Sequence, residues 1–228
     1  MSIACYSESS YLCNRKFINY NYLRYEEYFQ GFFSQCARPE GFLGRCMLRF
    51  MNLCHAPLTN WGLDKVSFRD GMTMLDIGCG GGATLKRLLK RSTGGKVYGI
   101  DISAESVAKA KNLNKQLLGS QVFVEQGSAD SLPWAPQTFD VVTAVETVYF
   151  WPELPKCFQE VKRVLKSGGQ FAIMLEVIEG DSKWTNVVEG MIVYPPEQLK
   201  DMLEQAGFSD VEVFRRKPSY ATIKGILK

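Results

Sequence analysis

Three acidic residues in the middle of the chain stand at or near the ends of expected strands. Asp76 lies two residues before the run Gly78-Cys79-Gly80-Gly81-Gly82. Asp101 ends a second strand, and Asp130 follows a third. A glycine run lets a ligand lie against bare backbone, because glycine has no Cβ and tolerates positive φ. Carboxylates accept hydrogen bonds from hydroxyl and amino groups. Together these residues predict a site for a ligand that carries such groups.

Each feature also has an alternative interpretation. Asp101 stands where dinucleotide-binding proteins accept hydrogen bonds from ribose hydroxyls, but it could instead cap the helix that starts near Ser103. Asp130 could accept from an exocyclic amino group, as on adenine, or simply belong to a turn. The glycines satisfy the dinucleotide pattern G-x-G-x-x-G/A, although the carboxylate of Asp76 would oppose a pyrophosphate and suits a cationic group.

The elements that position these residues alternate between strand and helix from Met72 onward. Strands are expected at Thr73–Ile77, Lys96–Ile100, Gln121–Glu125, Phe139–Val145, Gln170–Glu176, Val211–Arg216 and Tyr220–Leu227. Helices are expected at Ala83–Arg91, Ala104–Leu118, Pro152–Leu165 and Pro196–Ala206. This alternation predicts an α/β fold with a mostly parallel sheet and helices on both faces. Only three residues separate the last two strands, which is too short for a crossover, so they must form an antiparallel hairpin.

The region before this alternation has a different composition. We interpret residues 1–66 as a helical, aromatic-rich cover and residues 67–228 as the main domain. Ten tyrosine and phenylalanine residues fall within the first 40 positions. Helices are expected at Asn19–Cys36 and Gly41–His55, and Pro57 is expected to end the second. The aromatic side chains could pack this region onto the main domain or form a lid over an apolar substrate.

Five stretches match the motifs of one enzyme family: Leu75-Asp76-Ile77-Gly78-Cys79-Gly80-Gly81-Gly82, Val97-Tyr98-Gly99-Ile100-Asp101-Ile102-Ser103, Ala129-Asp130-Ser131-Leu132-Pro133-Trp134, Phe139-Asp140-Val141-Val142 and Val164-Leu165-Lys166-Ser167-Gly168-Gly169. They resemble the class I S-adenosylmethionine-dependent methyltransferases, in the group called methyltransferase type 11, and are similar to the ubiquinone/menaquinone C-methyltransferases. The resemblance covers about residues 64–216. It implies a Rossmann-like seven-stranded sheet with an antiparallel last strand, S-adenosylmethionine as cofactor and S-adenosylhomocysteine as product.

The resemblance also implies roles for single positions. The glycine loop would lie under the methionine part of the cofactor, with Asp76 near its ammonium group through water. Asp101 would hold both ribose hydroxyls. Ile102 would lie against the adenine face, and Glu146 would contact the amino-acid end. The expected cofactor-contacting set, in which Ala129 and Asp130 meet the adenine edge, is Asp76, Gly78, Cys79, Gly80, Gly82, Asp101, Ile102, Ser128, Ala129, Asp130 and Glu146.

Catalytic residues are harder to predict for this reaction. Methyl transfer from a sulfonium is an in-line displacement, so the protein mainly has to align the nucleophile, the methyl group and the sulfur in a water-poor pocket. A general base is needed only if the acceptor must lose a proton. The candidates are Glu146, Tyr149 and His55, the only histidine. His55 could instead cap a helix or interact with its dipole.

Composition narrows the class of partner. The net charge of +3 is too small to indicate a nucleic-acid or anionic-membrane partner. The chain has no apolar run of transmembrane length and no signal-peptide core, so we expect a cytoplasmic protein without a membrane partner. Its seven cysteines include no C-x-x-C pair and predict neither a disulfide framework nor a metal site. The oligomeric state is not predicted.

We therefore predict a methyltransferase that acts on a small, partly apolar acceptor. An NAD(P)-dependent oxidoreductase could use the same glycines, but Asp76, Asp130 and the terminal hairpin favour the methyl donor. A non-catalytic S-adenosylmethionine-binding protein is a second alternative. The sequence does not predict whether oxygen, nitrogen, carbon or sulfur receives the methyl group.

Overall fold

The computed structural model describes residues 41–177, 190–216 and 219–228. The predicted helix Asn19–Cys36 lies outside these ranges, as do the ten aromatic residues of the first 40 positions. The described residues form one central sheet with helices packed around it, and they include every motif named above.

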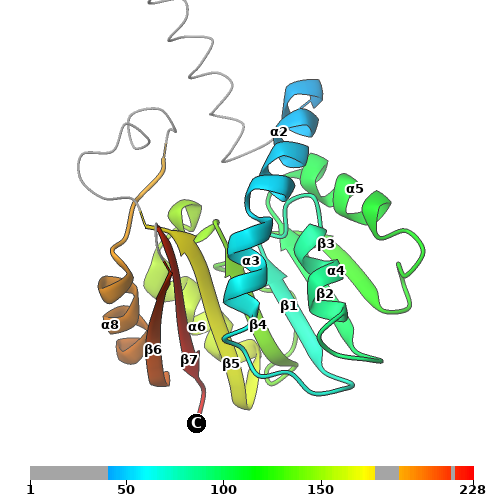
Figure 1. The fold of residues 1–228 in the computed structure, drawn as a ribbon. Coiled ribbons are helices and arrows are strands. Elements are labelled where there is room, and N and C mark those ends of the chain that lie inside the picture. Colours follow the sequence, from blue (N-terminus) through cyan, green and yellow to red (C-terminus); the bar gives the residue numbers. More distant parts are fainter. Residues whose placement is uncertain (1–40, 178–189, 217–218) are drawn as a thin grey trace, which may run out of the picture.

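Seven strands form the sheet (Figure 1). They are β1 (Thr73–Ile77), β2 (Lys96–Asp101), β3 (Val122–Gln126), β4 (Phe139–Val145), β5 (Leu165–Glu176), β6 (Ser209–Arg216) and β7 (Tyr220–Ile226). Their order is β3-β2-β1-β4-β5-β7-β6. The first five are parallel to one another, whereas β7 lies between β5 and β6 and is antiparallel to both. The prediction of a mostly parallel sheet with an antiparallel last strand is therefore confirmed.

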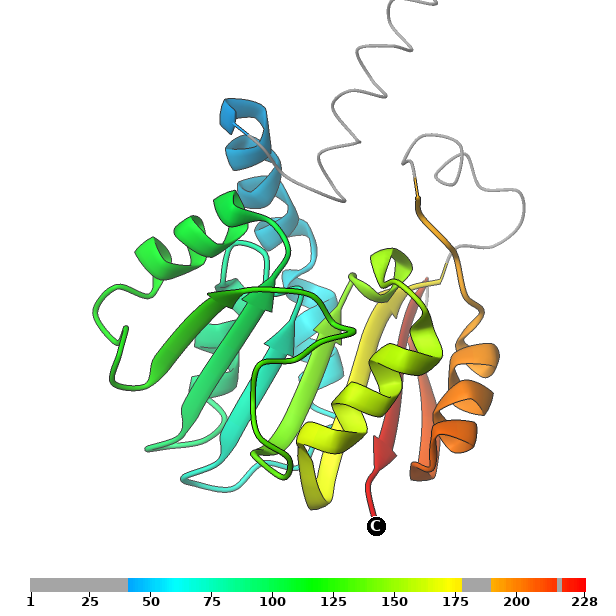
Figure 2. The ribbon, with the colours of Figure 1, turned by 180° about the vertical axis from the view of Figure 1, so that it is seen from behind.

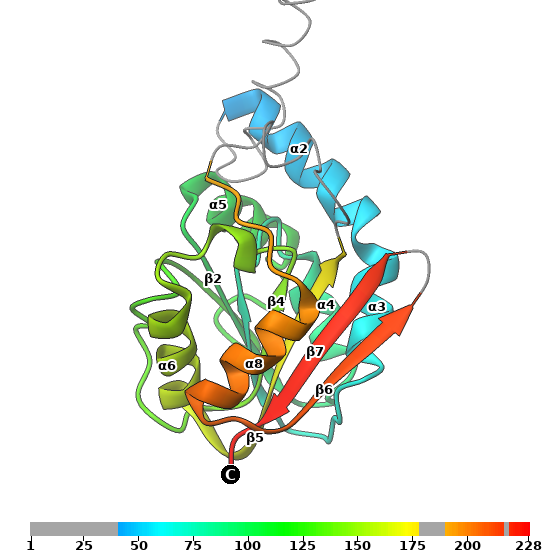
Figure 3. The ribbon, with the colours of Figure 1, turned by 90° about the vertical axis from the view of Figure 1, so that its left-hand side faces the viewer.

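Helices cover both faces of this sheet. They are α2 (Gly41–Cys54), α3 (Ala56–Leu63), α4 (Ala83–Leu89), α5 (Ala104–Leu113), α6 (Leu154–Val164) and α8 (Pro196–Ala206), together with the short 3₁₀ helix η2 (Val148–Phe150). Helices α3, α4 and α5 lie on one face, and α6 and α8 lie on the other (Figures 1 and 2). Figure 3 shows α2 rising past the edge of the sheet where the parallel strands end.

The alternation of side chains along β1 sends its residues to two different cores. Leu75 and Ile77 are buried in the cluster that α6 and α8 cover. Met74 is buried in the cluster beneath α3, α4 and α5. Side chains two apart on a strand share a face, so Asp76 lies on the same face as Met74. It is almost completely buried, with 1% of its surface exposed.

The helix predicted at Gly41–His55 ends just before Pro57, one residue earlier than predicted. Helix α2 ends at Cys54, and α3 begins two residues later with Pro57 in its first turn. Proline is tolerated there because the N–H that it lacks has no partner within the helix. His55 therefore lies at the junction between two helices. Its backbone carbonyl accepts hydrogen bonds from both the backbone N–H and the hydroxyl of Thr59.

Helix α5 ends at Leu113, five residues before the predicted end at Leu118. The side-chain amide of Asn114, the next residue, donates hydrogen bonds to the carbonyls of Ala110 and Gly82, at 2.8 and 3.1 Å. The first of these satisfies a carbonyl in the last turn of the helix, and the second ties that turn to the glycine loop. Asn114 thus links α5 to the loop that follows β1.

Candidate functional site

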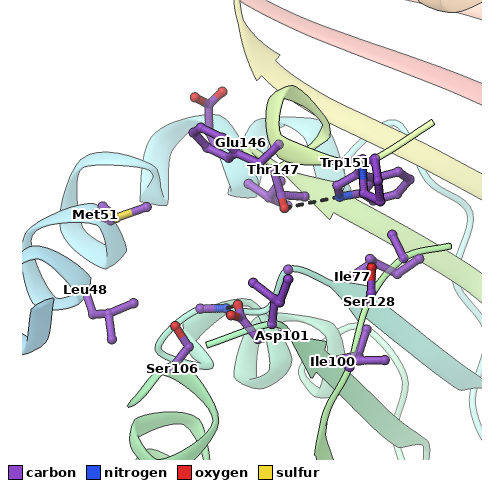
Figure 4. A pocket seen from close by; sticks show the side chains of 18 residues that line it. Leu48, Met51, Ile77, Ile100, Asp101, Ser106, Ser128, Glu146, Thr147 and Trp151 are labelled. Carbon is purple, nitrogen blue, oxygen red and sulfur yellow. Dashed lines mark hydrogen bonds between the residues drawn. The ribbon is translucent and has the colours of Figure 1, made fainter. Parts of the chain in front are cut away.

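A cleft opens where β1, β2, β3 and β4 end, at the carboxyl edge of the parallel strands (Figure 4). Its empty volume, counted together with the open solvent at its mouth, is about 700 Å³. Residues that follow these four strands form its floor and one wall, and Leu48 and Met51 of α2 form part of the other wall. Of the expected cofactor positions, the cleft is lined by Gly78, Gly80, Asp101, Ile102, Ser128, Ala129 and Glu146.

The glycines of the loop are required for two different reasons. Gly78, Gly80 and Gly82 all have positive φ, between +50° and +77°. A Cβ on Gly78 would lie only 2.1 Å from the hydroxyl oxygen of Thr147, and one on Gly82 would lie 2.8 Å from the backbone of Ala110. These two glycines allow the protein to pack against itself. A Cβ on Gly80 would meet only Leu48, at 3.7 Å, so Gly80 is the glycine that presents open backbone to the cleft.

Asp101 connects the glycine loop to the end of β2. One carboxylate oxygen accepts a hydrogen bond from the backbone N–H of Gly80 at 2.8 Å. The other oxygen accepts from the N–H of Ser103 at 2.9 Å. Burial raises the pKa of Asp101, while both of these hydrogen bonds lower it. Each carboxylate oxygen can accept a further hydrogen bond. Asp101 thus acts as a cap and also has acceptor capacity facing the cleft.

Asp76 and Cys79 lie beneath the loop and do not line the cleft. The hydroxyl of Thr143 donates to the Asp76 carboxylate at 2.7 Å. Burial raises the pKa of Asp76 to about 7. Cys79 is buried against Gly99, and burial also raises the pKa of its thiol. A buried thiol with a raised pKa is a poor nucleophile, so Cys79 serves packing.

The turn after β3 divides its residues between the cleft and the surface. Ser128 and Ala129 line the cleft. The carboxylate of Asp130 instead forms an ion pair with Lys156 of α6 at 3.1 Å. Hydrogen bonds from the side chains of Ser128 and Lys156 lower the pKa of Asp130. In this structure the carboxylate expected at the adenine edge is therefore engaged with a lysine.

The residues after β4 form the opposite end of the cleft. Glu146, Thr147 and Trp151 line it, and the indole N–H of Trp151 donates to the Thr147 hydroxyl at 3.3 Å (Figure 4). Glu146 has a φ of +55°, which is unusual for a residue with a side chain. Its carboxylate accepts a hydrogen bond from the backbone N–H of Glu176. Burial raises the pKa of Glu146 to about 8.

The two other catalytic candidates lie outside the cleft lining. The Tyr149 ring is buried, and its hydroxyl donates to the backbone carbonyl of Glu176 at 3.0 Å. Burial raises the pKa of Tyr149 far above its usual range. His55 is half-buried at the α2–α3 junction, where burial lowers its pKa to about 4. Of the three candidates, only Glu146 is among the residues that line the cleft.

Several lining residues are not among the predicted site residues. Ile77 lines the cleft directly before the glycine loop, and Ile100 lines it directly before Asp101. Each is the last residue of a strand expected from the sequence, and this position was a usable signal. Ser106 lies one helical turn beyond the cap residue Ser103. Leu48 lies on the helix expected at Gly41–His55, but periodicity does not reveal that this helix reaches the end of the sheet. Among the described residues, no group of three His, Cys, Asp or Glu side chains could hold a metal ion.

Comparison with known proteins identifies the family. Residues 68–207 match a family model described as a methyltransferase domain, and this match covers more than half of the chain. The chain belongs to the class I S-adenosylmethionine-dependent methyltransferases. The seven-stranded sheet with β7 inserted antiparallel between β5 and β6 agrees with this family.

Three matches illustrate how this methyltransferase relates to other members. Methyltransferase phqN of Penicillium fellutanum is 34% identical over 116 residues, which are 50% of this chain and 35% of that protein. An uncharacterized methyltransferase of Bacillus subtilis, YdaC, is 26% identical over 163 residues, 68% of this chain and 82% of that protein. The structure of an S-adenosylmethionine-dependent methyltransferase from Aquifex aeolicus matches with a TM-score of 0.62 and 26% identity, over 75% of this chain and 89% of that chain. The chain thus spans about a third of the first relative and most of the second.

The residues of the cleft fit S-adenosylmethionine, the cofactor of this family. A ribose offers two hydroxyl donors, which the Asp101 carboxylate can accept. Apolar side chains of Ile100 and Ile102 stand beside it for an aromatic base. At Gly80 the backbone is bare, and a Cβ there would occupy the space between the loop and Leu48. These features provide an acceptor, an apolar wall and a close backbone approach in one cleft.

Proposed function

We propose that this chain transfers a methyl group from S-adenosylmethionine to a small, partly apolar acceptor. The observation that carries the proposal is the composition of the two ends of the cleft. One end has the Asp101 carboxylate and the bare backbone of Gly80. The other has aromatic side chains of Phe150 and Trp151, opposite Met51. An apolar acceptor can lose its water shell at the second end.

The chain's own residues would mainly bind, orient and exclude water. S-adenosylmethionine supplies an activated methyl group on a sulfonium sulfur, so alignment in a dry cleft is the principal demand on the protein. Asp101 would hold the ribose. The carboxylate of Glu146, at the acceptor end, would accept a proton from an acceptor that has to lose one. Its raised pKa supports this role, because a base is most effective when its pKa lies near the working pH.

The two alternatives make different experimental predictions. Titration calorimetry of the full chain with S-adenosylhomocysteine and with NADH compares the two cofactor classes. We expect binding of S-adenosylhomocysteine alone, and binding of NADH alone would overturn the proposal. An assay for released S-adenosylhomocysteine across a panel of small apolar hydroxyl, amino, carbon-acid and thiol compounds then tests turnover. If S-adenosylhomocysteine binds but no compound raises the rate above that without acceptor, the non-catalytic alternative is correct.

The same proposal covers the cellular location, the class of partner and the domain division of the enzyme. Among the described helices, none is long and apolar enough to cross a bilayer. We place the protein in the cytoplasm, acting on a small molecule and not on a nucleic acid, in line with its modest net charge. Residues 1–66 would form a cover and residues 67–228 the methyltransferase domain. The likeness to ubiquinone/menaquinone C-methyltransferases stays a prediction about its subgroup.

A further inference from the structure

Helix α2 carries apolar side chains on two of its sides. On one side Met47 and Leu48 are buried, and Leu48 lines the cleft together with Met51. On a second side lies a stripe of exposed residues, which we call the α2 stripe: Leu43, Cys46, Phe50, Leu53 and Cys54. Their spacing of three, four and seven residues keeps them on one side of the helix. The exposed fractions of the three largest are 54%, 56% and 70%.

The α2 stripe differs from ordinary scattered surface residues. Single exposed apolar side chains are common on proteins, whereas a contiguous row marks an interaction surface. Within the described part of the chain, α2 packs against α5 and α3 through other sides. The stripe runs along the whole helix from its first turn to its last. The stripe therefore forms an apolar ridge about 20 Å long, which a partner could cover.

We propose that residues 1–40 of the same chain cover the α2 stripe. These residues directly precede Gly41, the first residue of α2. They contain ten tyrosine and phenylalanine residues, which are the side chains best suited to bury apolar surface. They also contain four basic and four acidic residues, so their net charge is zero. A neutral, aromatic segment is suited to an apolar stripe and has no charge that favours another surface.

The entry to α2 is compatible with a reversal of the chain. Gly41 has a φ of +60°, and a Cβ there would meet nothing within 4 Å. Glycine therefore suits this position because of its positive φ, and not because a side chain would clash with a neighbour. Pro39 stands two residues earlier and disfavours a helix that continues straight through this point. The stripe spans about 20 Å, which about seven extended residues can cover. Forty residues are ample for this.

Covalent linkage also favours this occupant over others. A segment joined to the stripe through a short connection is present at an effective concentration of about millimolar. A second copy of the chain at micromolar concentration, or a membrane, would have to compete with it. Because Leu48 and Met51 are on the same helix, covering the stripe would also hold the cleft wall in place. Residues 1–40 would then influence the site without contacting it.

The two cysteines of the stripe provide a local test in the full-length chain. The rates at which a maleimide labels Cys46 and Cys54 are measured by peptide mass spectrometry at a low micromolar protein concentration. Three full-length variants are compared with the parent. The stripe variant carries Leu43→Ser, Phe50→Ser and Leu53→Ser, and the segment variant carries Tyr25→Ser, Tyr28→Ser, Phe29→Ser and Phe32→Ser. The control variant replaces two exposed leucines elsewhere, with Leu117→Ser and Leu118→Ser.

We expect the parent and the control to be labelled at both cysteines at least about tenfold more slowly than the stripe and segment variants. A cooperative thermal unfolding transition in each of the four proteins shows that all of them are folded. Fast labelling in the parent would overturn the proposal. Protection that grows with protein concentration, with a dimer seen by sedimentation, would assign the stripe to a second copy. Protection only in the presence of phosphatidylserine vesicles would assign it to a membrane. Either of the last two results also overturns the proposal.

Discussion

The hydroxyl of Thr143 donates a hydrogen bond to the carboxylate of Asp76 over 2.7 Å, directly beneath the glycine loop. The two residues are register partners on β4 and β1, and both are buried within the sheet. Burial raises the pKa of Asp76 to about 7, and this hydrogen bond opposes that rise because it favours the charged form. Asp101 raises the same pKa further through its charge, and Arg87 lowers it. The charge of Asp76 at neutral pH therefore depends on Thr143.

Replacing Thr143 with valine should raise the pKa of Asp76 still further, since valine has nearly the same shape but no donor. If the ionised Asp76 supports binding of the cofactor's ammonium group, affinity for S-adenosylhomocysteine at pH 7 should fall about tenfold and recover at higher pH. Calorimetric titrations between pH 6 and pH 9 measure this. Thr143→Ser keeps the donor and should retain the parent's pH dependence. Equal profiles for the valine and serine variants would refute the role assigned to Thr143.

Asp76 should also make stability depend on pH. Its pKa is higher in the folded protein than the usual value of 3.8, so the folded state holds the proton more tightly than the unfolded state. Its contribution to stability is thus fully present below pH 3.8 and is lost as pH rises to about 7. Asp76→Asn removes this titration, so its stability relative to the parent should increase between pH 5 and pH 8, by up to about 3 kcal/mol. Urea unfolding at constant ionic strength measures the difference, and a flat difference would contradict it.

Gly78→Ala should destabilise the protein through a clash with Thr147. Gly119 has nearly the same φ, +79°, but a Cβ there meets nothing within 4 Å, so Gly119→Ala reports the backbone cost alone. That cost is about 1 kcal/mol, and the clash should add about 1–3 kcal/mol. Thermal unfolding of both variants measures the two contributions. In a Thr147→Ala background the extra cost of Gly78→Ala should shrink, and an undiminished cost would show that the clash is not its cause.

Asp101→Ala should weaken cofactor binding and loosen the glycine loop. The backbone N–H groups of Gly80 and Ser103 would lose their acceptor, and a bound ribose would lose one too. Hydrogen bonds to a charged group contribute about 1.5–3 kcal/mol, so affinity for S-adenosylhomocysteine should fall at least about tenfold. Glu125→Ala, an exposed carboxylate on the neighbouring strand β3, is the matched control and should bind like the parent. Unchanged affinity in Asp101→Ala would mean that Asp101 serves only as a cap.

The pH profile of turnover should distinguish the role of Glu146 as a base from the structural role of Tyr149. A carboxylate acts as a base when it is deprotonated, so methyl transfer to an acceptor that loses a proton should speed up as pH passes about 8, the pKa of Glu146. Glu146→Gln should remove this rise. Tyr149→Phe removes a hydrogen bond to the Glu176 carbonyl and should cost about 1 kcal/mol of stability without altering the profile. A profile that Tyr149→Phe alters and Glu146→Gln leaves intact would reverse these roles.

Much of the fold could be predicted because its signals are local. The bounds of β1, β4 and α8 agree with the prediction residue for residue, since each is a short apolar or amphipathic run with clear ends. The antiparallel last strand followed from a connection too short for a crossover. Boundaries failed where a distant contact decides them. Helix α5 stops where Asn114 bonds to Gly82, 32 residues away.

The sequence by itself determined the family, the succession of strands and helices along the chain, and the position of the glycine loop. It could do so because motifs and periodicity act over a few neighbouring residues. Only the tertiary structure decided how the site is assembled. It pairs Asp76 with Thr143 across 67 residues, packs Thr147 against Gly78, and turns Asp130 toward Lys156. These contacts depend on strand register and on the face to which each side chain points, and no local pattern encodes which distant residue will stand opposite.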